Sequence, residues 1–171
     1  LAIAAARLGF VCHIYSDSER SPATGVAARS VIGGYADHAK IEAFAKTVDV
    51  LTYEFENVPA QSAKISEGVT ILRPGARVLD TAQDRLTEKT FISETAGVPV
   101  TPFMDIKTLD DLRQAAEDMA LPFVLKTRRM GYDGKGQIII REQSQLETAF
   151  KQLGDVPLIA EQFIDFRIDL T

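Results

Sequence analysis

The sequence predicts an α/β protein whose first part contains a parallel sheet. Short apolar runs alternate with amphipathic segments along the chain, and this order of strands and helices is typical of parallel sheets. Of the 171 residues, 46% are hydrophobic and 25% are charged, which is the composition of a folded domain. This length suffices for one ordinary domain or for two small ones.

Four strands are expected in the first part of the chain. The apolar start, LAIAAARLGFVCHI, is interrupted by Arg7 and predicts the end of a helix followed by a strand, not a signal peptide or a membrane span. The strands are expected at residues 10–16, 30–35, 49–57 and 69–74. A helix is expected at 38–48, where four apolar side chains share one helical face: Ile41, Phe44, Ala45 and Val48.

The second part predicts a unit of mixed helices and strands that begins with a helix at about 82–96. Thr81 and Asp84 have the spacing of a capping box, with Asp in place of the usual Glu or Gln. Gly97 and Pro99 mark the end of this helix. Strands are then expected at 102–106, 122–127, 137–141 and 157–163, with helices at 108–119 and 143–153.

The segment VLKTRRMGYDGKGQ joins two of these strands and concentrates glycine and positive charge. Residues 126–137 carry four cations and one acid, whereas the chain after residue 82 has 11 cations and 15 acids. Three glycines allow the backbone to approach a ligand closely and to reach positive φ. Lys126 and Lys135 add charge-assisted hydrogen bonds of roughly 1.5–3 kcal/mol each. The residues alone predict either an anion-binding hairpin or a hairpin with solvated cations at its tip, since neither common phosphate-loop pattern occurs.

Charge and composition exclude several other classes of protein. The formal net charge is −5, from 19 Lys and Arg against 24 Asp and Glu, so a non-specific nucleic-acid binder is not expected. Cys12 is the only cysteine and cannot form an internal disulfide, which fits a reducing compartment. The two histidines, His13 and His38, do not have the spacing of metal ligands.

Three motifs together resemble a known family. YEFENVP (53–59), AQDRLTEKTF (82–91) and the glycine segment occur in register, and they closely resemble the 5-(carboxyamino)imidazole ribonucleotide synthases, ATP-grasp enzymes of purine biosynthesis. The likeness runs along the whole sequence. It implies a Rossmann-like domain at 1–82 and, at 83–171, the lid (α+β) and the start of the remainder of an ATP-grasp domain. Both are expected to be incomplete, the first at its start and the second at its end.

The resemblance also implies a reaction and its partners. These enzymes carboxylate 5-aminoimidazole ribonucleotide with bicarbonate and ATP, releasing ADP and phosphate, and they use magnesium. The magnesium ligands are expected outside this sequence, so no metal ligand is assigned and the fragment alone is expected to be inactive. The expected partners are small molecules, with no nucleic acid and no membrane. The full-length protein is expected to be a cytoplasmic homodimer.

Individual residues acquire expected roles from the same resemblance. Arg85 resembles the arginine that reaches the phosphates of the nucleotide, and Lys126 resembles the strand lysine that contacts the α-phosphate. The loop that closes on the phosphates comprises Gly131, Tyr132, Asp133, Gly134, Lys135, Gly136 and Gln137. Three of its residues resemble the catalytic groups that face the ribonucleotide and the carboxyphosphate: Tyr132, Asp133 and Lys135.

The nucleotide base and ribose have expected contacts near the end of the sequence. The segment LIAEQFI (158–164) resembles the hinge strand that holds adenine through its backbone. Its expected adenine-site residues are Glu161, Gln162, Phe163 and Ile164. Asp169 stands where the family usually has a glutamate that bonds the ribose hydroxyls.

Simpler interpretations of the same residues remain open from the sequence alone. Arg85 fits a helix-surface partner of Glu88, and Lys126 fits a strand-end lysine that extends to solvent. Asp133 fits a turn-stabilising residue. Two other functions also remain open. One is a different ATP-grasp ligase, such as a formate-dependent glycinamide ribonucleotide transformylase or a biotin carboxylase. The other is a non-catalytic nucleotide-binding module.

Overall fold

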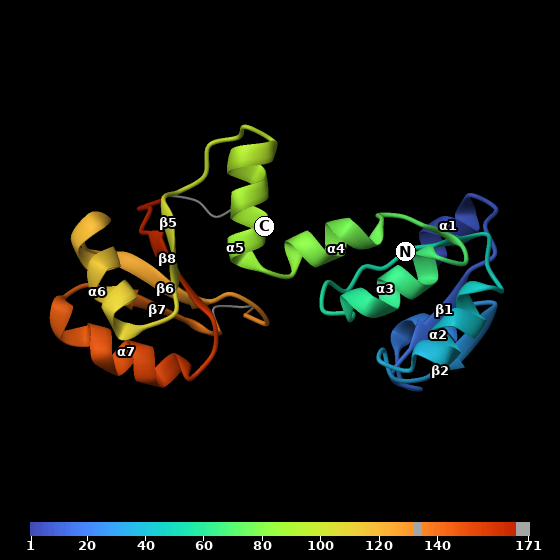
Figure 1. Cartoon of the computed structure of the whole chain (residues 1–171). Helices are drawn as coiled ribbons and strands as arrows, with labels where there is room; N and C mark the ends of the chain where they lie inside the picture. The colour runs from blue at the N-terminus through green and yellow to red at the C-terminus, as the bar shows by residue number, and fades with distance from the viewer. Residues whose placement is uncertain (132–134, 167–171) are drawn as a thin grey trace. The chain divides into compact units, whose positions relative to one another are not determined.

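The computed structural model describes residues 1–131 and 135–166. By its internal contacts the chain divides into two compact units, Leu1–Asp80 and Thr81–Thr171 (Figure 1). Each unit has its own sheets and its own hydrophobic core.

The first unit contains two pairs of parallel strands. Strand β1 (His13–Ser16) pairs with β2 (Arg29–Ile32), and β3 (Val50–Leu51) pairs with β4 (Ile71–Leu72). The helices of this part are α1 (Ala2–Arg7), the 3₁₀ turn η1 (Pro22–Gly25), α2 (His38–Ala45), α3 (Ala60–Glu67) and α4 (Ala76–Ala82). Parallel pairing confirms the α/β prediction.

Two of the four predicted strands in this unit are much shorter than expected. Of the segments 49–57 and 69–74, only two residues each form a regular strand. Pro74 and Gly75 directly follow Arg73 after β4, and both residue types are depleted in strands. The sequence pattern therefore located these strands but overestimated their length.

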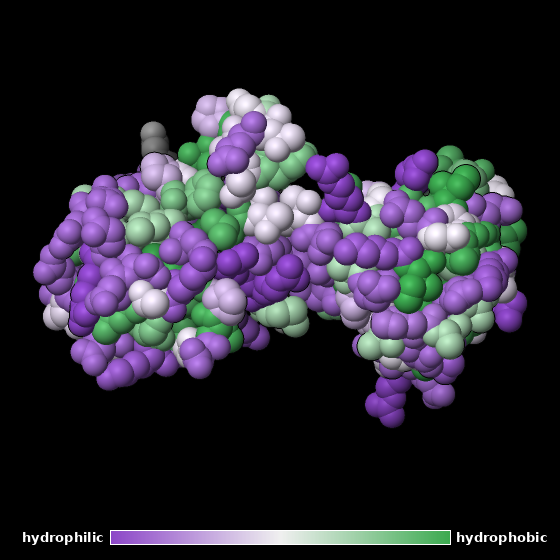
Figure 2. All heavy atoms as spheres, in the orientation of Figure 1, coloured by the Kyte–Doolittle hydropathy of each residue, from purple (hydrophilic) through white to green (hydrophobic). Residues whose placement is uncertain are grey.

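Apolar side chains around α1 lie at the surface of the first unit, as Figure 2 shows. The large exposed hydrophobic residues of this region are Leu1, Ile3, Leu8, Phe10 and Val11. No residue of α1 is buried, so the core cluster is formed elsewhere, by Ala63, Leu72, Ala76 and Leu79. None of the helices that the structure describes is long and apolar enough to cross a membrane.

The helix predicted at 82–96 is divided into shorter elements. Helix α4 ends at Ala82, α5 (Arg85–Thr90) begins after a break, and a π-helical turn, η2 (Phe91–Thr95), continues it. Asp84 is the N-cap of α5, where its carboxylate accepts hydrogen bonds from the N–H groups of Leu86 (3.1 Å) and Thr87 (3.2 Å). The predicted start at Thr81 was wrong because Asp84 satisfies the free N–H groups of a helix that begins at Arg85.

The second unit is built on a four-stranded antiparallel sheet with the order β5-β8-β6-β7. Its strands are β5 (Phe103–Ile106), β6 (Phe123–Thr127), β7 (Gln137–Ile140) and β8 (Leu158–Gln162). The helices are α6 (Leu109–Asp118) and α7 (Leu146–Leu153), the latter preceded by a 3₁₀ turn, η3 (Gln143–Gln145). All four predicted strands and both predicted helices are confirmed here.

The two faces of this sheet have different environments. Figure 1 shows α6 and α7 on one side of the sheet and α5 on the other. The face covered by α6 and α7 holds the core, whose fully buried members include Ile106, Leu112, Phe123, Leu125, Ile140 and Leu158. Side chains alternate between faces along a strand. Lys126 and Glu161 therefore point to the face where α5 lies.

We expect Leu112→Ala in α6 to lower the free energy of unfolding of the second unit by about 3–5 kcal/mol, because it leaves a cavity in a fully buried cluster. Glu117→Ala on the exposed side of the same helix is the matched control and should change it by less than about 0.5 kcal/mol. Urea unfolding followed by circular dichroism measures both. Equal costs for the two variants would contradict this account of the core.

Candidate functional site

The candidate site lies on the α5 side of the four-stranded sheet. Helix α5, the strands β5, β6 and β8, and the loop after β6 all contribute side chains to it. The residues that meet there are Asp84, Arg85, Lys89, Asp105, Lys126, Arg128, Arg129 and Glu161.

A buried carboxylate pairs with two lysines in this site. The register places Val124 of β6 opposite Glu161 of β8, so Lys126 is the diagonal neighbour of Glu161 on the same face. Lys126 Nζ donates to Glu161 Oε2 at 3.0 Å, and Lys89 Nζ lies 3.4 Å from the same oxygen. Only 8% of the Glu161 side chain is exposed. The interpretation of Lys126 as a lysine that extends to solvent was therefore wrong.

Arg85, the first residue of α5, is bound to the backbone of the glycine segment. Its guanidinium donates to the carbonyl oxygen of Thr127 at 2.8 Å and to that of Gly131. Its own backbone N–H donates to the carbonyl oxygen of Arg128 at 3.0 Å. Arg85 thus holds the two ends of the residues 127–131 against the helix, and it does not act as a surface partner of Glu88.

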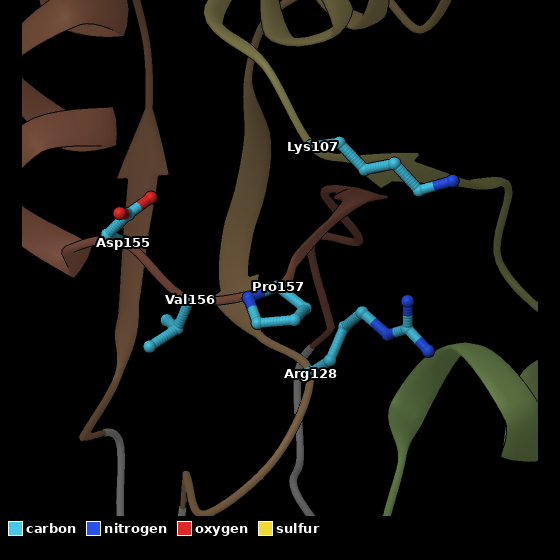
Figure 3. A pocket seen from close by; sticks show the side chains of 5 residues that line it. All are labelled: Lys107, Arg128, Asp155, Val156 and Pro157. Atoms are coloured by element: carbon cyan, nitrogen blue, oxygen red, sulfur yellow. The ribbon is translucent and has the colours of Figure 1, made fainter.

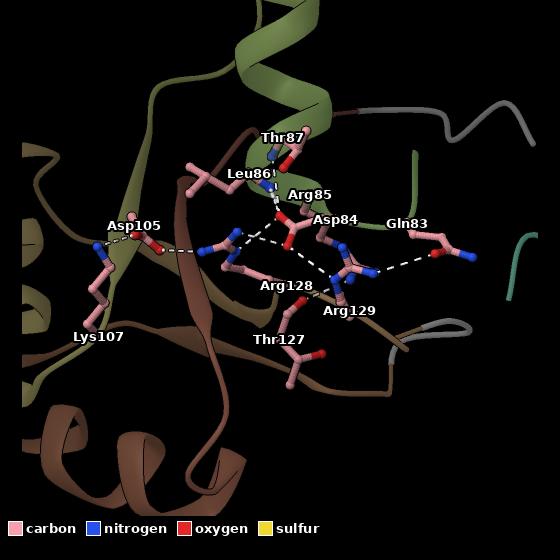
Figure 4. A network of polar contacts seen from close by, with 10 residues as sticks. All are labelled: Gln83, Asp84, Arg85, Leu86, Thr87, Asp105, Lys107, Thr127, Arg128 and Arg129. Carbon is pink, nitrogen blue, oxygen red and sulfur yellow. Dashed lines mark hydrogen bonds and ion pairs between the residues drawn. The ribbon is translucent and has the colours of Figure 1, made fainter. Parts of the chain in front are cut away.

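Asp84 is the centre of a second charged network, drawn in Figure 4. Arg128 binds it with two parallel hydrogen bonds, from Nε to Oδ1 at 3.0 Å and from Nη2 to Oδ2 at 2.8 Å. Arg129 Nε adds a third contact at 3.3 Å, and Arg128 Nη1 also reaches Asp105 Oδ1 at 3.2 Å. A bidentate arginine–carboxylate pair fixes geometry as well as charge. The first residues of the glycine segment are therefore tied to α5 and β5.

The charges of this network are stabilised by their partners. Burial by itself raises the pKa of the Asp84 carboxyl, but the hydrogen bonds from Arg128 and from the N–H of Thr87, with the charges of Arg128 and Arg129, outweigh it and lower that pKa. The hydrogen bond to Asp84 is the largest cause that raises the pKa of Arg128. Both groups are therefore charged at neutral pH.

The surplus of positive charge seen in residues 126–137 is largely neutralised by distant parts of the chain. Lys126, Arg128 and Arg129 each have a carboxylate partner, and these partners are Glu161, Asp84 and Asp105. Local charge alone therefore does not establish an anion site, because the compensating acids lie far away in sequence, and that site stays a prediction. An incoming anion would have to exchange with these carboxylates.

Two glycines of the glycine segment, Gly131 and Gly136, lie too close to neighbouring atoms to carry a side chain. Gly136 has φ +70°, and a Cβ there would lie 2.7 Å from Thr127 Oγ1. A Cβ on Gly131 would lie 2.9 Å from the carbonyl oxygen of Lys135. Gln137 begins β7 opposite Lys126 and completes the hairpin. Three expected loop residues, Tyr132, Asp133 and Gly134, lie outside the described residues.

The expected adenine-site segment is partly engaged within the unit. The N–H of Gln162 donates to the carbonyl oxygen of Pro102 at 2.9 Å, and its own carbonyl accepts from Thr101 Oγ1 at 3.2 Å. The Phe163 ring lies 5.8 Å from the guanidinium carbon of Arg141, which is within cation–π distance. Ile164 is exposed. The expected ribose residue, Asp169, lies outside the described residues.

A pocket lies beside this site but does not coincide with it. Figure 3 shows its lining residues, Lys107, Arg128, Asp155, Val156 and Pro157. It shares Arg128 and Lys107 with the network of Figure 4, since Lys107 forms an ion pair with Asp105 at 3.2 Å. Among the described residues, none of those expected to bind the nucleotide lines it. In the part of the chain that the structure describes, no three His, Cys, Asp or Glu side chains are grouped to hold a metal ion.

Two contributors to the site were missed in the sequence. Lys89 had no expected role, although it lies four residues after Arg85 and therefore on the same face of α5. That spacing was a usable signal. Asp105 was missed as well, and its pairing with Arg128 joins segments 23 residues apart, for which the sequence has no local signal.

We expect Asp84→Asn to lower the free energy of unfolding of the second unit by about 3–5 kcal/mol at pH 7. Asparagine still caps a helix, but Arg128 loses its bidentate carboxylate partner in a largely buried place and keeps only the single contact with Asp105. A carboxyl whose pKa is lowered by folding stabilises the folded state at pH values above its unfolded pKa of about 3.9. This stabilisation is lost as the pH falls through the pKa of the folded state. Urea unfolding at pH 7 and at pH 3 should therefore show that the difference in the free energy of unfolding between wild type and variant is smaller at pH 3.

Asp110→Asn is the control for this experiment, because the Asp110 carboxylate is 87% exposed beside Arg113. This substitution should lower the free energy of unfolding by less than about 1 kcal/mol. A difference for Asp84→Asn that is the same at both pH values would contradict the charge argument.

The two parts of the chain match two known families of domains. Residues 1–83 match the family model of the ribonucleotide synthetase preATP-grasp domain, and residues 91–171 match that of the ATP-grasp domain. The N5-carboxyaminoimidazole ribonucleotide synthase of Bacillus subtilis is 35% identical over 171 residues, which are all of this chain and 45% of that protein. The chain therefore spans less than half the length of this relative.

Solved structures of such synthetases are also similar to this chain. The N5-carboxyaminoimidazole ribonucleotide synthetase of Thermus thermophilus is 37% identical with a TM-score of 0.88. The Staphylococcus aureus N5-carboxyaminoimidazole synthetase, complexed with ADP, is 34% identical with a TM-score of 0.91. Each match covers 97% of this chain and 44% of the other. By these matches residues 91–171 resemble the ATP-grasp domain, and the chain is similar along its whole length to the N5-carboxyaminoimidazole ribonucleotide synthases.

Proposed function

We propose that the protein carboxylates 5-aminoimidazole ribonucleotide with bicarbonate and ATP, giving 5-(carboxyamino)imidazole ribonucleotide, ADP and phosphate in purine biosynthesis. The observation that carries this proposal is the similarity to synthases of that product along the whole chain, through both of its units. Because the chain spans less than half of these relatives, the activity is proposed for the protein that contains it.

The nucleotide would bind on the α5 side of the sheet in the second unit. Lys126 and Arg85 lie on this side together, and both side chains carry N–H donors that now bond to protein oxygens and that suit phosphate oxygens equally. The Staphylococcus aureus relative is complexed with ADP, which supports an adenine nucleotide as a ligand of this protein. Lys126 would contact the phosphates by exchanging its bond to Glu161. Arg85 would reach them from the position in which it holds the glycine segment.

The remaining site residues keep the roles that the family suggests. The segment Gly131–Gln137 would close on the phosphates, and Tyr132, Asp133 and Lys135 would face the substrates. Residues 161–164 would line the adenine site, and Asp169 would bond the ribose. The proposed contribution of the chain is to position charge in a partly buried site, which is the main requirement of phosphoryl transfer.

The domains, the metal and the surroundings of the protein are part of the same proposal. We assign residues 1–82 to the Rossmann-like domain and 83–171 to the ATP-grasp domain, and both the two compact units and the two family matches support this division. Magnesium would accompany ATP, but the buried carboxylates described here are paired with cations, so no residue of this chain is assigned to it. A cytoplasmic homodimer is proposed from the family resemblance.

The proposed reaction predicts that phosphate release requires three substrates at once. A protein that contains this chain should release phosphate from ATP only when bicarbonate and 5-aminoimidazole ribonucleotide are both present. A coupled phosphate assay with each substrate omitted in turn measures this requirement. Release that depends instead on formate and glycinamide ribonucleotide would favour a different ATP-grasp ligase.

We expect Lys126→Ala to weaken ATP binding by about tenfold, because it removes a charge-assisted hydrogen bond of about 1.5 kcal/mol or more. Lys151→Ala is the matched control, since Lys151 forms an exposed ion pair with Glu147 on α7. Calorimetric titration with ATP compares the two variants. An unchanged affinity in Lys126→Ala would remove Lys126 from the proposed phosphate site.

A further inference from the structure

We propose that Lys89 is a positioning residue for nucleotide binding, which keeps the Glu161 carboxylate paired when Lys126 turns to the phosphates. This inference rests on the proposed function and deepens it. It assigns a role to a lysine that the sequence motifs left without one.

The position of Lys89 follows from the geometry of α5. It lies one helical turn after Arg85, so both side chains leave the helix on the side that faces the sheet. Lys89 Nζ lies 3.4 Å from Glu161 Oε2, and Lys126 Nζ lies 3.0 Å from the same atom. The side chains of Lys89 and Lys126 are 18% and 24% exposed, so the three groups form a compact and largely buried charge cluster.

The charges of this cluster are unequal in number. Two ammonium groups share one carboxylate, so the group as a whole carries one positive charge. A carboxylate as buried as Glu161 is strongly destabilised without a partner. Glu161 would therefore hold Lys126 firmly if Lys126 were its only cation. A second cation on the same oxygen weakens this dependence.

Exchange of partners explains why both lysines are present. When the nucleotide arrives, the Lys126 ammonium moves its hydrogen bond from Glu161 to a phosphate oxygen. Lys89 remains beside Glu161, compensates its charge and offsets its repulsion from the phosphates. Lys89 therefore acts through Glu161 and Lys126, without itself contacting the nucleotide.

The test is a double-mutant cycle of Lys89→Met and Glu161→Gln, measured by calorimetric titration with ADP. In the wild-type background, Lys89→Met should weaken ADP binding by about tenfold, because Glu161 then competes with the phosphates for Lys126. In the Glu161→Gln background, the same substitution should change the affinity by less than about twofold, because no carboxylate remains to compensate. Lys151→Met is the surface control and should leave ADP affinity unchanged in both backgrounds.

Conservative rescue provides a second measurement that does not need Glu161→Gln to fold. Lys89→Arg keeps a cation beside Glu161, so its ADP affinity should stay within about threefold of wild type. A loss as large as that of Lys89→Met would overturn the proposal.

Each remaining outcome also decides between interpretations. An equal loss for Lys89→Met in both backgrounds would mean that Lys89 contacts the phosphates directly. A lowered melting temperature with unchanged ADP affinity would mean that Lys89 has only a structural role. Either result overturns the inference and leaves the proposed function standing. If the wild-type protein does not bind ADP, both proposals fail.

Discussion

The carboxylate of Asp84 is the group on which the arrangement of the site depends. It caps α5 with one pair of hydrogen bonds and binds Arg128 with another, so one side chain fixes both the start of the helix and the first residues of the glycine segment. Since α5 begins at Arg85, both Arg85 and Lys89 are directed at the sheet. If a residue one position away were anchored by Arg128 in place of Asp84, the helix would turn these two cations by about 100°.

The site is organised by ion pairs between segments that are distant in the sequence. Lys126 and Arg128 follow each other closely in the hairpin, yet they bind acids on two different elements, Glu161 of β8 and Asp84 before α5. Each pair is largely buried, where breaking a pair costs much more than it does at the surface. The two pairs therefore hold the hairpin to its neighbours, and the cations keep defined positions before any ligand arrives.

Much of the fold could be predicted from the sequence, and less of the site. The strands of the second unit coincide with short apolar runs, and α6 lies within the expected range 108–119, where the Thr108 side chain accepts from the N–H of Asp111. The break before α5 was missed because Asp84 was expected inside a helix capped by Thr81, whereas in the folded chain Asp84 is itself the N-cap. The pairing of Lys126 with Glu161 spans 35 residues and depends on strand order, which local patterns do not encode.

Strand β6 serves two purposes with alternate residues, and this limits how the gene can change. Phe123 and Leu125 enter the core, while Val124 and Lys126 face the opposite side. A deletion or insertion of a single codon within this strand would exchange the two sets, placing the lysine charge among Leu112 and Ile140 and the aromatic ring beside Glu161. Substitutions can be tolerated one position at a time, but a shift in length damages folding and ligand binding together. The length of β6 should therefore vary far less than its composition among functional descendants.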